Sequence, residues 1–78
     1  GRHEFRDVWG TRWLVIGYGA IGREIGIRAR AFGAHVTGVR RSPDGADPAD
    51  AMITPDRIMA ALPETDVVVL AAPHSGDT

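Results

Sequence analysis

The six residues Gly17-Tyr18-Gly19-Ala20-Ile21-Gly22 constrain the fold of this 78-residue chain more than any other segment. An unbroken apolar run precedes them and predicts a strand over Arg12–Ile16. From Ala20 onward, apolar residues recur at helical spacing, which predicts a helix over Ala20–Phe32 with one apolar face formed by Ile21, Ile25, Ala29 and Phe32. Because a strand, a glycine turn and a helix in this order begin a βα unit, we predict an α/β protein.

Further elements follow along the chain. Gly33 stands where a left-handed residue commonly ends a helix. The elements predicted after it are a strand over His35–Val39, a loop over Pro43–Ala51, a short helix over Pro55–Leu62 stopped by Pro63, and a strand over Val67–Ala71. Strands that alternate with helices form a parallel sheet. We therefore expect a Rossmann-type βαβαβ half-domain with a three-stranded parallel sheet.

Right-handed crossovers would place both predicted helices on the same face of that sheet. The strand over 67–71 is nevertheless apolar throughout, as strands covered on both faces are. We therefore expect part of a doubly wound fold, whose other half follows in a longer chain or is supplied by a partner molecule. Residues 1–78 then form one partial domain, with a leading segment over 1–11, the βαβαβ unit over 12–71 and a loop over 72–78.

Composition argues against several kinds of site and partner. The chain has no cysteine, so it holds neither a disulfide nor a thiolate metal site, and its three histidines are too widely spaced to suggest a metal cluster. A formal net charge of −1 argues against nucleic acid or an acidic membrane surface as a partner. No apolar run approaches the roughly 20 residues of a membrane helix, and no signal peptide is visible, so we expect a cytoplasmic protein.

The glycine turn predicts a phosphate site. The first N–H groups of a helix lack intrahelical partners, and the helix dipole is positive at that end. In this interpretation Gly17 makes the tight turn, Gly19 lets a diphosphate approach, and Gly22 lets the helix pack closely on the strand. The N–H groups of Ala20 and Ile21 are the predicted phosphate donors. We therefore expect a dinucleotide cofactor, NAD or NADP.

The end of the second predicted strand indicates which of the two cofactors is preferred. An acidic side chain there selects NAD by binding the ribose 2′-hydroxyl, but this chain has Arg40-Arg41-Ser42. Arginine forks match phosphate oxygens, so we predict a preference for NADP, with NAD still possible. The alternative is that the two arginines are simply solvated. Ala72 and Pro73, at the end of the last strand, are predicted to line the adenosine side of the cofactor or, in the case of Pro73, merely to end the strand.

The sequence resembles a known family. The segments Val15–Ile25 and Ala31–Gly38, the latter containing the Phe32-Gly33 step, look like the cofactor domain of the D-isomer-specific 2-hydroxyacid dehydrogenases. The run Thr65–Leu70, followed by a loop with Pro73 that ends at Thr78, is also typical of that family. The resemblance extends from about Val8 to Thr78.

The resemblance implies reversible hydride transfer between a nicotinamide and a small 2-keto or D-2-hydroxy acid. It places Ala20 and Ile21 at the diphosphate, Arg40 at the ribose and Ala72-Pro73 beside the adenosine. Most NAD-using members have Asp where Arg40 stands, so the sequence is more similar to the glyoxylate and hydroxypyruvate reductase branch, which favours NADPH. The catalytic Arg, Glu and His of the family come after Thr78, so these 78 residues contain no catalytic residue and are expected to be inactive alone. A homo-oligomer is expected for the whole enzyme.

Two other functions share the glycine turn. One is a non-catalytic nucleotide-sensing module that binds NAD or a related ligand to regulate another protein. The other is an NAD domain of the adenosylhomocysteinase type, which the basic residues at the second strand end disfavour. The Phe32-Gly33 step and the loop from Pro73 to Thr78 favour the dehydrogenase over the sensing module.

Overall fold

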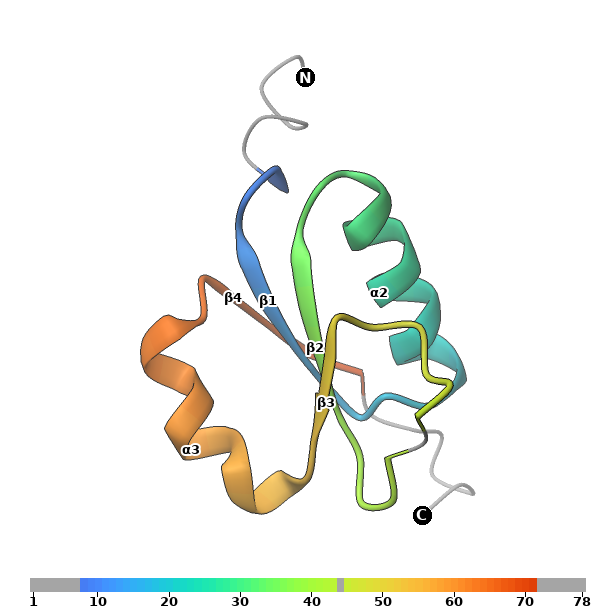
Figure 1. Ribbon diagram of the computed structural model, residues 1–78, viewed down its shortest axis with the longest axis vertical. Helices are drawn as coiled ribbons and strands as arrows, with labels where there is room; N and C mark the ends of the chain where they lie inside the picture. Colours follow the sequence, from blue (N-terminus) through green and yellow to red (C-terminus); the bar gives the residue numbers. More distant parts are fainter. Residues whose placement is uncertain (1–7, 44, 72–78) are drawn as a thin grey trace.

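The computed structural model describes residues 8–43 and 45–71 of the chain. They form a four-stranded parallel sheet in the order β3-β2-β1-β4, with helix α2 on one side and helix α3 on the other (Figure 1). The elements are β1 (Arg12–Ile16), α2 (Ala20–Ala31), β2 (His35–Val39), β3 (Ala51–Ile53), α3 (Ile58–Ala61) and β4 (Val67–Leu70). The predicted α/β fold with a parallel sheet is confirmed, and no helix in the described ranges is long and apolar enough to cross a membrane.

The prediction of three strands is wrong, because Ala51–Ile53 form a fourth strand that begins at the last residue of the predicted loop over 43–51. This strand pairs in parallel with the second half of β2, Thr37 opposite Ala51 and Val39 opposite Ile53. A strand of three residues is too short to show an alternating pattern in the sequence. It is a strand because its backbone pairs with β2, and this pairing depends on the folded arrangement of the chain and not on the local sequence.

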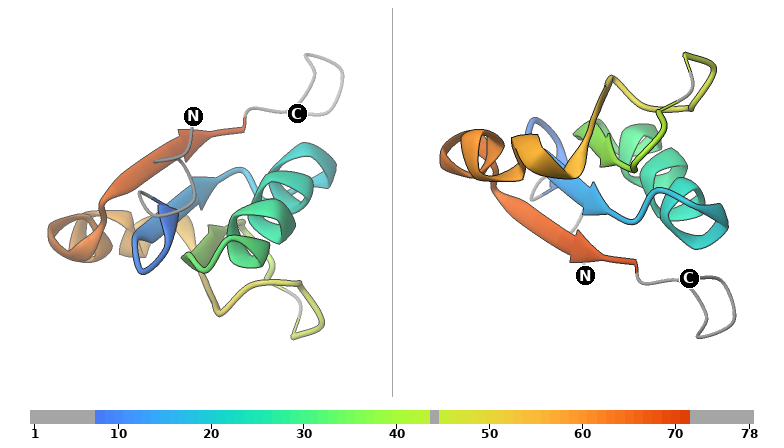
Figure 2. Two further views of the ribbon diagram at one scale, coloured as in Figure 1. Left: turned by 90° about the horizontal axis from the view of Figure 1, so that it is seen from above. Right: turned by 90° about the horizontal axis from the view of Figure 1, so that it is seen from below.

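The prediction that both helices cover the same face is also wrong. The chain steps from β1 to β2 and β3 in one direction, and then returns past them to place β4 on the far side of β1. Reversing the direction of a right-handed crossover moves its helix to the opposite face. Figure 2 shows α2 and α3 on opposite sides of the sheet when it is viewed along its edge. The second face is therefore covered in part within the described residues, over Leu14 and Val39 but not over Val68 and Leu70 of β4.

The α-helix before β4, Ile58–Ala61, is shorter than the predicted helix over Pro55–Leu62. Pro55–Arg57 and Leu62–Glu64 form single 3-10 turns on either side of α3. Pro63 lies in the first turn of the second 3-10 segment. The missing N–H of proline costs no hydrogen bond at such a position, because the first N–H groups of a helix have no acceptor within it. It therefore continues the helical path to Glu64 and does not stop it at Leu62 as predicted.

Helix α2 approaches the sheet through small residues. Gly22, Gly26 and Ala29 are its buried positions, whereas Ile21 and Phe32 are 52% and 44% exposed, so the predicted apolar face is wrong at both ends. Small side chains allow the helix axis to lie close to the strands beneath it. The helix ends as predicted, with Gly33 at a left-handed φ of 93°.

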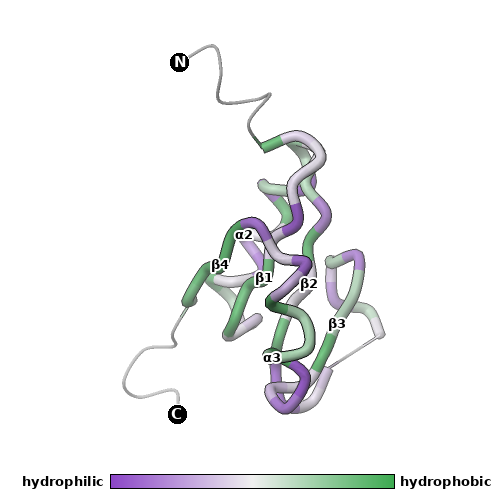
Figure 3. Tube along the Cα trace, turned by 90° about the vertical axis from the view of Figure 1, so that its left-hand side faces the viewer, coloured by the Kyte–Doolittle hydropathy of each residue, from purple (hydrophilic) through white to green (hydrophobic). Residues whose placement is uncertain are grey.

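The core lies mainly between α2 and the sheet. Val15 and Val36 are fully buried there, together with Tyr18, and Val69 of β4 packs against them. On the opposite face Leu14 and Val39 are each 1% exposed. The edge strand β4 is the exception, since Val68 and Leu70 are 47% and 75% exposed, and Figure 3 shows β4 as an apolar segment at the left-hand edge.

Candidate functional site

The glycine turn after β1 is bound to the end of β2. Gly17 has a φ of 91°, a left-handed conformation that only glycine adopts without strain, and this reverses the chain out of β1. The amides of Gly17 and Tyr18 both donate to the carbonyl oxygen of Val39, at 3.0 and 2.9 Å, and the Gly19 amide donates to the Gly17 carbonyl at 2.8 Å. The turn and the last residue of β2 are therefore held in one fixed arrangement.

The first turn of α2 presents free amides beside this turn. Gly19 is the N-cap and has no side chain to cap the helix, and the first hydrogen bond runs from the Arg23 amide to the Gly19 carbonyl at 2.9 Å. Within the described part of the chain, the amides of Ala20, Ile21 and Gly22 have no acceptor, and no acidic residue lies in the first turn. Unpaired amides and the positive end of the helix dipole together favour an anion.

The second and third glycines of the motif have different surroundings. A Cβ on Gly22 would lie 2.5 Å from the carbonyl oxygen of Gly17 and 3.3 Å from Cγ1 of Val15, so only glycine allows α2 to pack this closely on β1. A Cβ on Gly19 would meet nothing within 4 Å. The space in front of Gly19 is open for a ligand to approach the backbone, as a diphosphate requires.

The position of this turn in the sheet suits a nucleotide. β1 lies between β2 and β4, and the chain reverses its direction of travel across the sheet between these two neighbours. In open α/β sheets, ligands bind outside the carboxyl ends of the strands at such a switch point. The glycine turn follows the carboxyl end of β1 and therefore lies at that point.

The structure places the three predicted selector residues directly after β2. Nη1 of Arg40 lies 3.1 Å from Oδ1 of Asp47, so this guanidinium is already paired within the protein. Arg41 and Ser42 are exposed, and Arg41 forms no ion pair with any described residue. Because Val39 binds the glycine turn, the segment Arg40–Ser42 begins at the residue next to the one that holds this turn.

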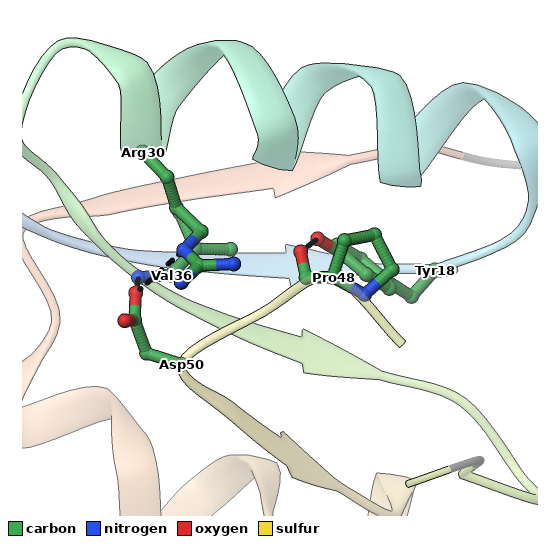
Figure 4. A network of polar contacts seen from close by, with 5 residues as sticks. All are labelled: Tyr18, Arg30, Val36, Pro48 and Asp50. Carbon is green, nitrogen blue, oxygen red and sulfur yellow. Dashed lines mark hydrogen bonds and ion pairs between the residues drawn. The ribbon is translucent and has the colours of Figure 1, made fainter. Parts of the chain in front are cut away.

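Tyr18 is a site residue that the sequence analysis missed. Its side chain is fully buried, and a Cβ on either Gly26 of α2 or Gly38 of β2 would overlap its ring. Its hydroxyl donates to the carbonyl oxygen of Pro48 at 2.6 Å (Figure 4), and burial raises the pKa of this phenol above its ordinary value. The glycines at 26 and 38, inside a helix and a strand, are the sequence signal for a large side chain between them.

The loop after β2 is fixed at a further residue. Oδ2 of Asp50 accepts a hydrogen bond of 2.8 Å from the Val36 amide and lies 3.4 Å from Nε of Arg30 (Figure 4). Together with Tyr18 on Pro48 and Arg40 on Asp47, these contacts hold residues 47–50 against α2 and β2. Residues 47–50 therefore have a fixed position beside α2 and β2.

Two predicted site residues, Ala72 and Pro73, lie outside the described residues. The remaining predicted residues, Gly17 to Gly22 and Arg40 to Ser42, are brought together at one end of the sheet by the hydrogen bonds to Val39. Among the described residues, no group of three or more His, Asp or Glu side chains is placed to hold a metal ion.

Comparisons with known proteins agree with this geometry. The D-isomer specific 2-hydroxyacid dehydrogenase NAD binding domain matches residues 1–78. Among solved structures, the chain is similar to a D-isomer specific 2-hydroxyacid dehydrogenase family protein from Aeromonas salmonicida, with 28% identity and a TM-score of 0.78 over 90% of this chain and 23% of that one. It is also similar to phosphoglycerate dehydrogenase from Lactobacillus plantarum, with 29% identity and a TM-score of 0.78 over 87% and 22% of the two chains.

A third neighbour is a glycerate dehydrogenase related protein from Thermoplasma acidophilum, with 30% identity and a TM-score of 0.68 over 91% of this chain and 24% of that one. The chain therefore spans less than a quarter of the length of these three proteins. Since the family match extends over residues 1–78, the chain belongs to the D-isomer specific 2-hydroxyacid dehydrogenases, within their NAD binding domain.

Proposed function

We propose that this chain binds NADP in preference to NAD and holds it for a dehydrogenase that acts on a small D-2-hydroxy acid or 2-keto acid. The observation that carries the proposal is the pair of hydrogen bonds from Gly17 and Tyr18 to the Val39 carbonyl. These bonds join the N-terminus of α2 to the end of β2, which continues into Arg40-Arg41-Ser42. A diphosphate bound at the N-terminus of α2 would place the adenosine ribose near the end of β2.

Each proposed residue has a distinct role. The amides of Ala20 and Ile21 donate to the diphosphate, Gly17 and Gly22 shape the turn, and Gly19 leaves the approach open. Arg41 supplies a guanidinium that has no ion-pair partner among the described residues and is proposed to bind the ribose 2′-phosphate. Arg40 contributes the donors that Asp47 does not occupy, and Ser42 adds a hydroxyl. Ala72 and Pro73 remain a proposal for the adenosine side. When bound, the nicotinamide supplies or accepts the hydride.

The cofactor preference is tested by titrating the full-length protein with NADPH and NADH in a calorimeter. NADPH should bind at least about tenfold more tightly, a difference of about 1.4 kcal/mol. Arg41→Ala should reduce NADPH affinity while leaving NADH affinity unchanged, since NADH has no 2′-phosphate. Equal affinity of the wild-type protein for both cofactors would contradict the proposed preference.

The reaction of the whole protein is also a proposal. We propose that the catalytic Arg, Glu and His lie beyond residue 78, so that these 78 residues bind the cofactor without turnover, and that the whole protein is a homo-oligomer. A cytoplasmic location stays a prediction. Assay of the full-length protein with glyoxylate, hydroxypyruvate and their D-hydroxy products tests the substrate class. Cofactor binding without oxidation or reduction of any 2-keto or 2-hydroxy acid would favour the nucleotide-sensing alternative.

A further inference from the structure

Asp47 faces the arginine that ends β2. Its carboxylate Oδ1 lies 3.1 Å from Nη1 of Arg40, and only 4% of the Asp47 side chain is exposed, against 38% of Arg40. A buried carboxylate is screened little by salt and water, so its charge acts strongly on its neighbours. The positive charge of Arg40 is therefore largely balanced inside the protein.

Asp47 is also held in place by the residues that follow it. The next residue, Pro48, accepts the Tyr18 hydroxyl at 2.6 Å, and Asp50 accepts the Val36 amide at 2.8 Å and pairs with Arg30 at 3.4 Å. These contacts come from α2, β2 and the glycine turn, so elements outside the loop fix the position of the Arg40 partner.

From this geometry we propose that Asp47 is a specificity-determining residue that weakens the preference for a 2′-phosphorylated cofactor. This inference rests on the proposed function, in which the residues after β2 receive the adenosine ribose. The 2′-phosphate of NADPH is repelled by the Asp47 carboxylate and competes with it for the Arg40 donors. The 2′-hydroxyl of NADH is neutral and experiences neither effect. Asp47 therefore reduces the difference between the affinities for NADPH and NADH.

The first test replaces Asp47 by its neutral isostere. In the full-length protein, Asp47→Asn should raise NADPH affinity about tenfold, or about 1.4 kcal/mol, and change NADH affinity less than about twofold, as measured by calorimetric titration. Asp50→Asn is the matched control, since it removes the same charge from the same loop but beside Arg30. It should leave the ratio of the two affinities unchanged. A variant that only disturbs the loop would instead weaken the binding of both cofactors by a similar factor.

A second variant keeps the proposal testable if Asp47→Asn does not fold. Removing one member of a buried ion pair is strongly destabilising, whereas removing both charges is often tolerated. Arg40→Gln alone leaves the carboxylate unbalanced and should weaken NADPH binding. Arg40→Gln with Asp47→Asn should bind NADPH at least about fivefold more tightly than Arg40→Gln alone, with NADH unchanged. If the double variant binds NADPH no better, the proposal is wrong.

The failure of this inference is distinguishable from failure of the proposed function. If Arg41→Ala and Arg40→Gln both leave NADPH affinity unchanged, the residues after β2 do not receive the phosphate, and both proposals fail. If these variants weaken NADPH binding while Asp47→Asn leaves it at the wild-type value, the proposed site stands and the role of Asp47 is refuted.

Discussion

The hydroxyl of Tyr18 donates a 2.6 Å hydrogen bond to the carbonyl oxygen of Pro48, and this bond joins the glycine turn to the loop that precedes β3. Because the Tyr18 ring fills the space left by Gly26 and Gly38, its hydroxyl has a defined position over that loop. Tyr18, the residue between the first two glycines of the motif, therefore helps to fix the loop at Pro48.

Tyr18→Phe should lower the free energy of unfolding by about 1 kcal/mol, since it removes one hydrogen bond and leaves the Pro48 carbonyl unpaired. Urea denaturation followed by tryptophan fluorescence measures this change. Tyr18→Ala also removes the ring and should cost about 3–5 kcal/mol. A Phe variant as stable as the wild type would show that the hydroxyl contributes nothing.

The stability of the protein should fall in alkaline solution because of the same phenol. Burial raises the pKa of Tyr18, so the folded protein keeps this proton to a higher pH than the unfolded chain, whose tyrosine titrates near 10. The stabilisation is therefore complete below about pH 10 and is lost as the pH rises through the raised value. Urea midpoints between pH 8 and 11 test this. The stability of Tyr18→Phe should depend less on pH over this range than that of the wild type. Identical pH profiles for the two proteins would contradict a role of the Tyr18 phenol.

The second and third glycines of the motif should respond differently to alanine. At Gly22 the new methyl group would lie 2.5 Å from a backbone carbonyl oxygen, so Gly22→Ala should destabilise the fold by about 1–3 kcal/mol. At Gly19 it would enter open space, so Gly19→Ala should leave the thermal midpoint almost unchanged and still weaken cofactor binding. Thermal denaturation and calorimetric titration of both variants separate the two effects. Tight cofactor binding by Gly19→Ala would exclude a diphosphate in front of that residue.

A polypeptide of these 78 residues alone should self-associate through β4. This edge strand exposes 75% of Leu70, and unpaired strand edges with apolar side chains readily pair with another chain. Leu70→Glu should shift the polypeptide toward monomer in sedimentation velocity. Met59→Glu, at a side chain that is 77% exposed on α3, is the control and should have little effect. A monomeric, sharply folded wild-type polypeptide would contradict the prediction.

Local patterns predicted the elements that border the site. The strands over Arg12–Ile16 and His35–Val39 have their predicted bounds, and α2 ends one residue before its predicted end. These elements have a continuous apolar run or clear end signals of their own. The glycine turn was found for a similar reason, since its three glycines lie within six consecutive residues.

The missed features depend on contacts between distant residues. Ala51–Ile53 becomes a strand because β2 supplies its hydrogen bonds, and β4 lies beside β1 because β3 occupies the other edge. The pairing of Arg40 with Asp47 was equally invisible, since the loop containing Asp47 has the composition of a solvated turn. The face of α2 was misassigned because glycines, which carry no apolar signal, form its contact with the sheet.

The shared acceptor at Val39 has a consequence for how this domain can change during evolution. Both hydrogen bonds from the turn end on a backbone carbonyl, so no side-chain substitution removes that acceptor. The segment that follows Val39 is then free to vary in charge and length while the glycine turn keeps its position. Cofactor choice can therefore diverge between related enzymes by changes in one short segment, with no loss of the ability to bind a dinucleotide.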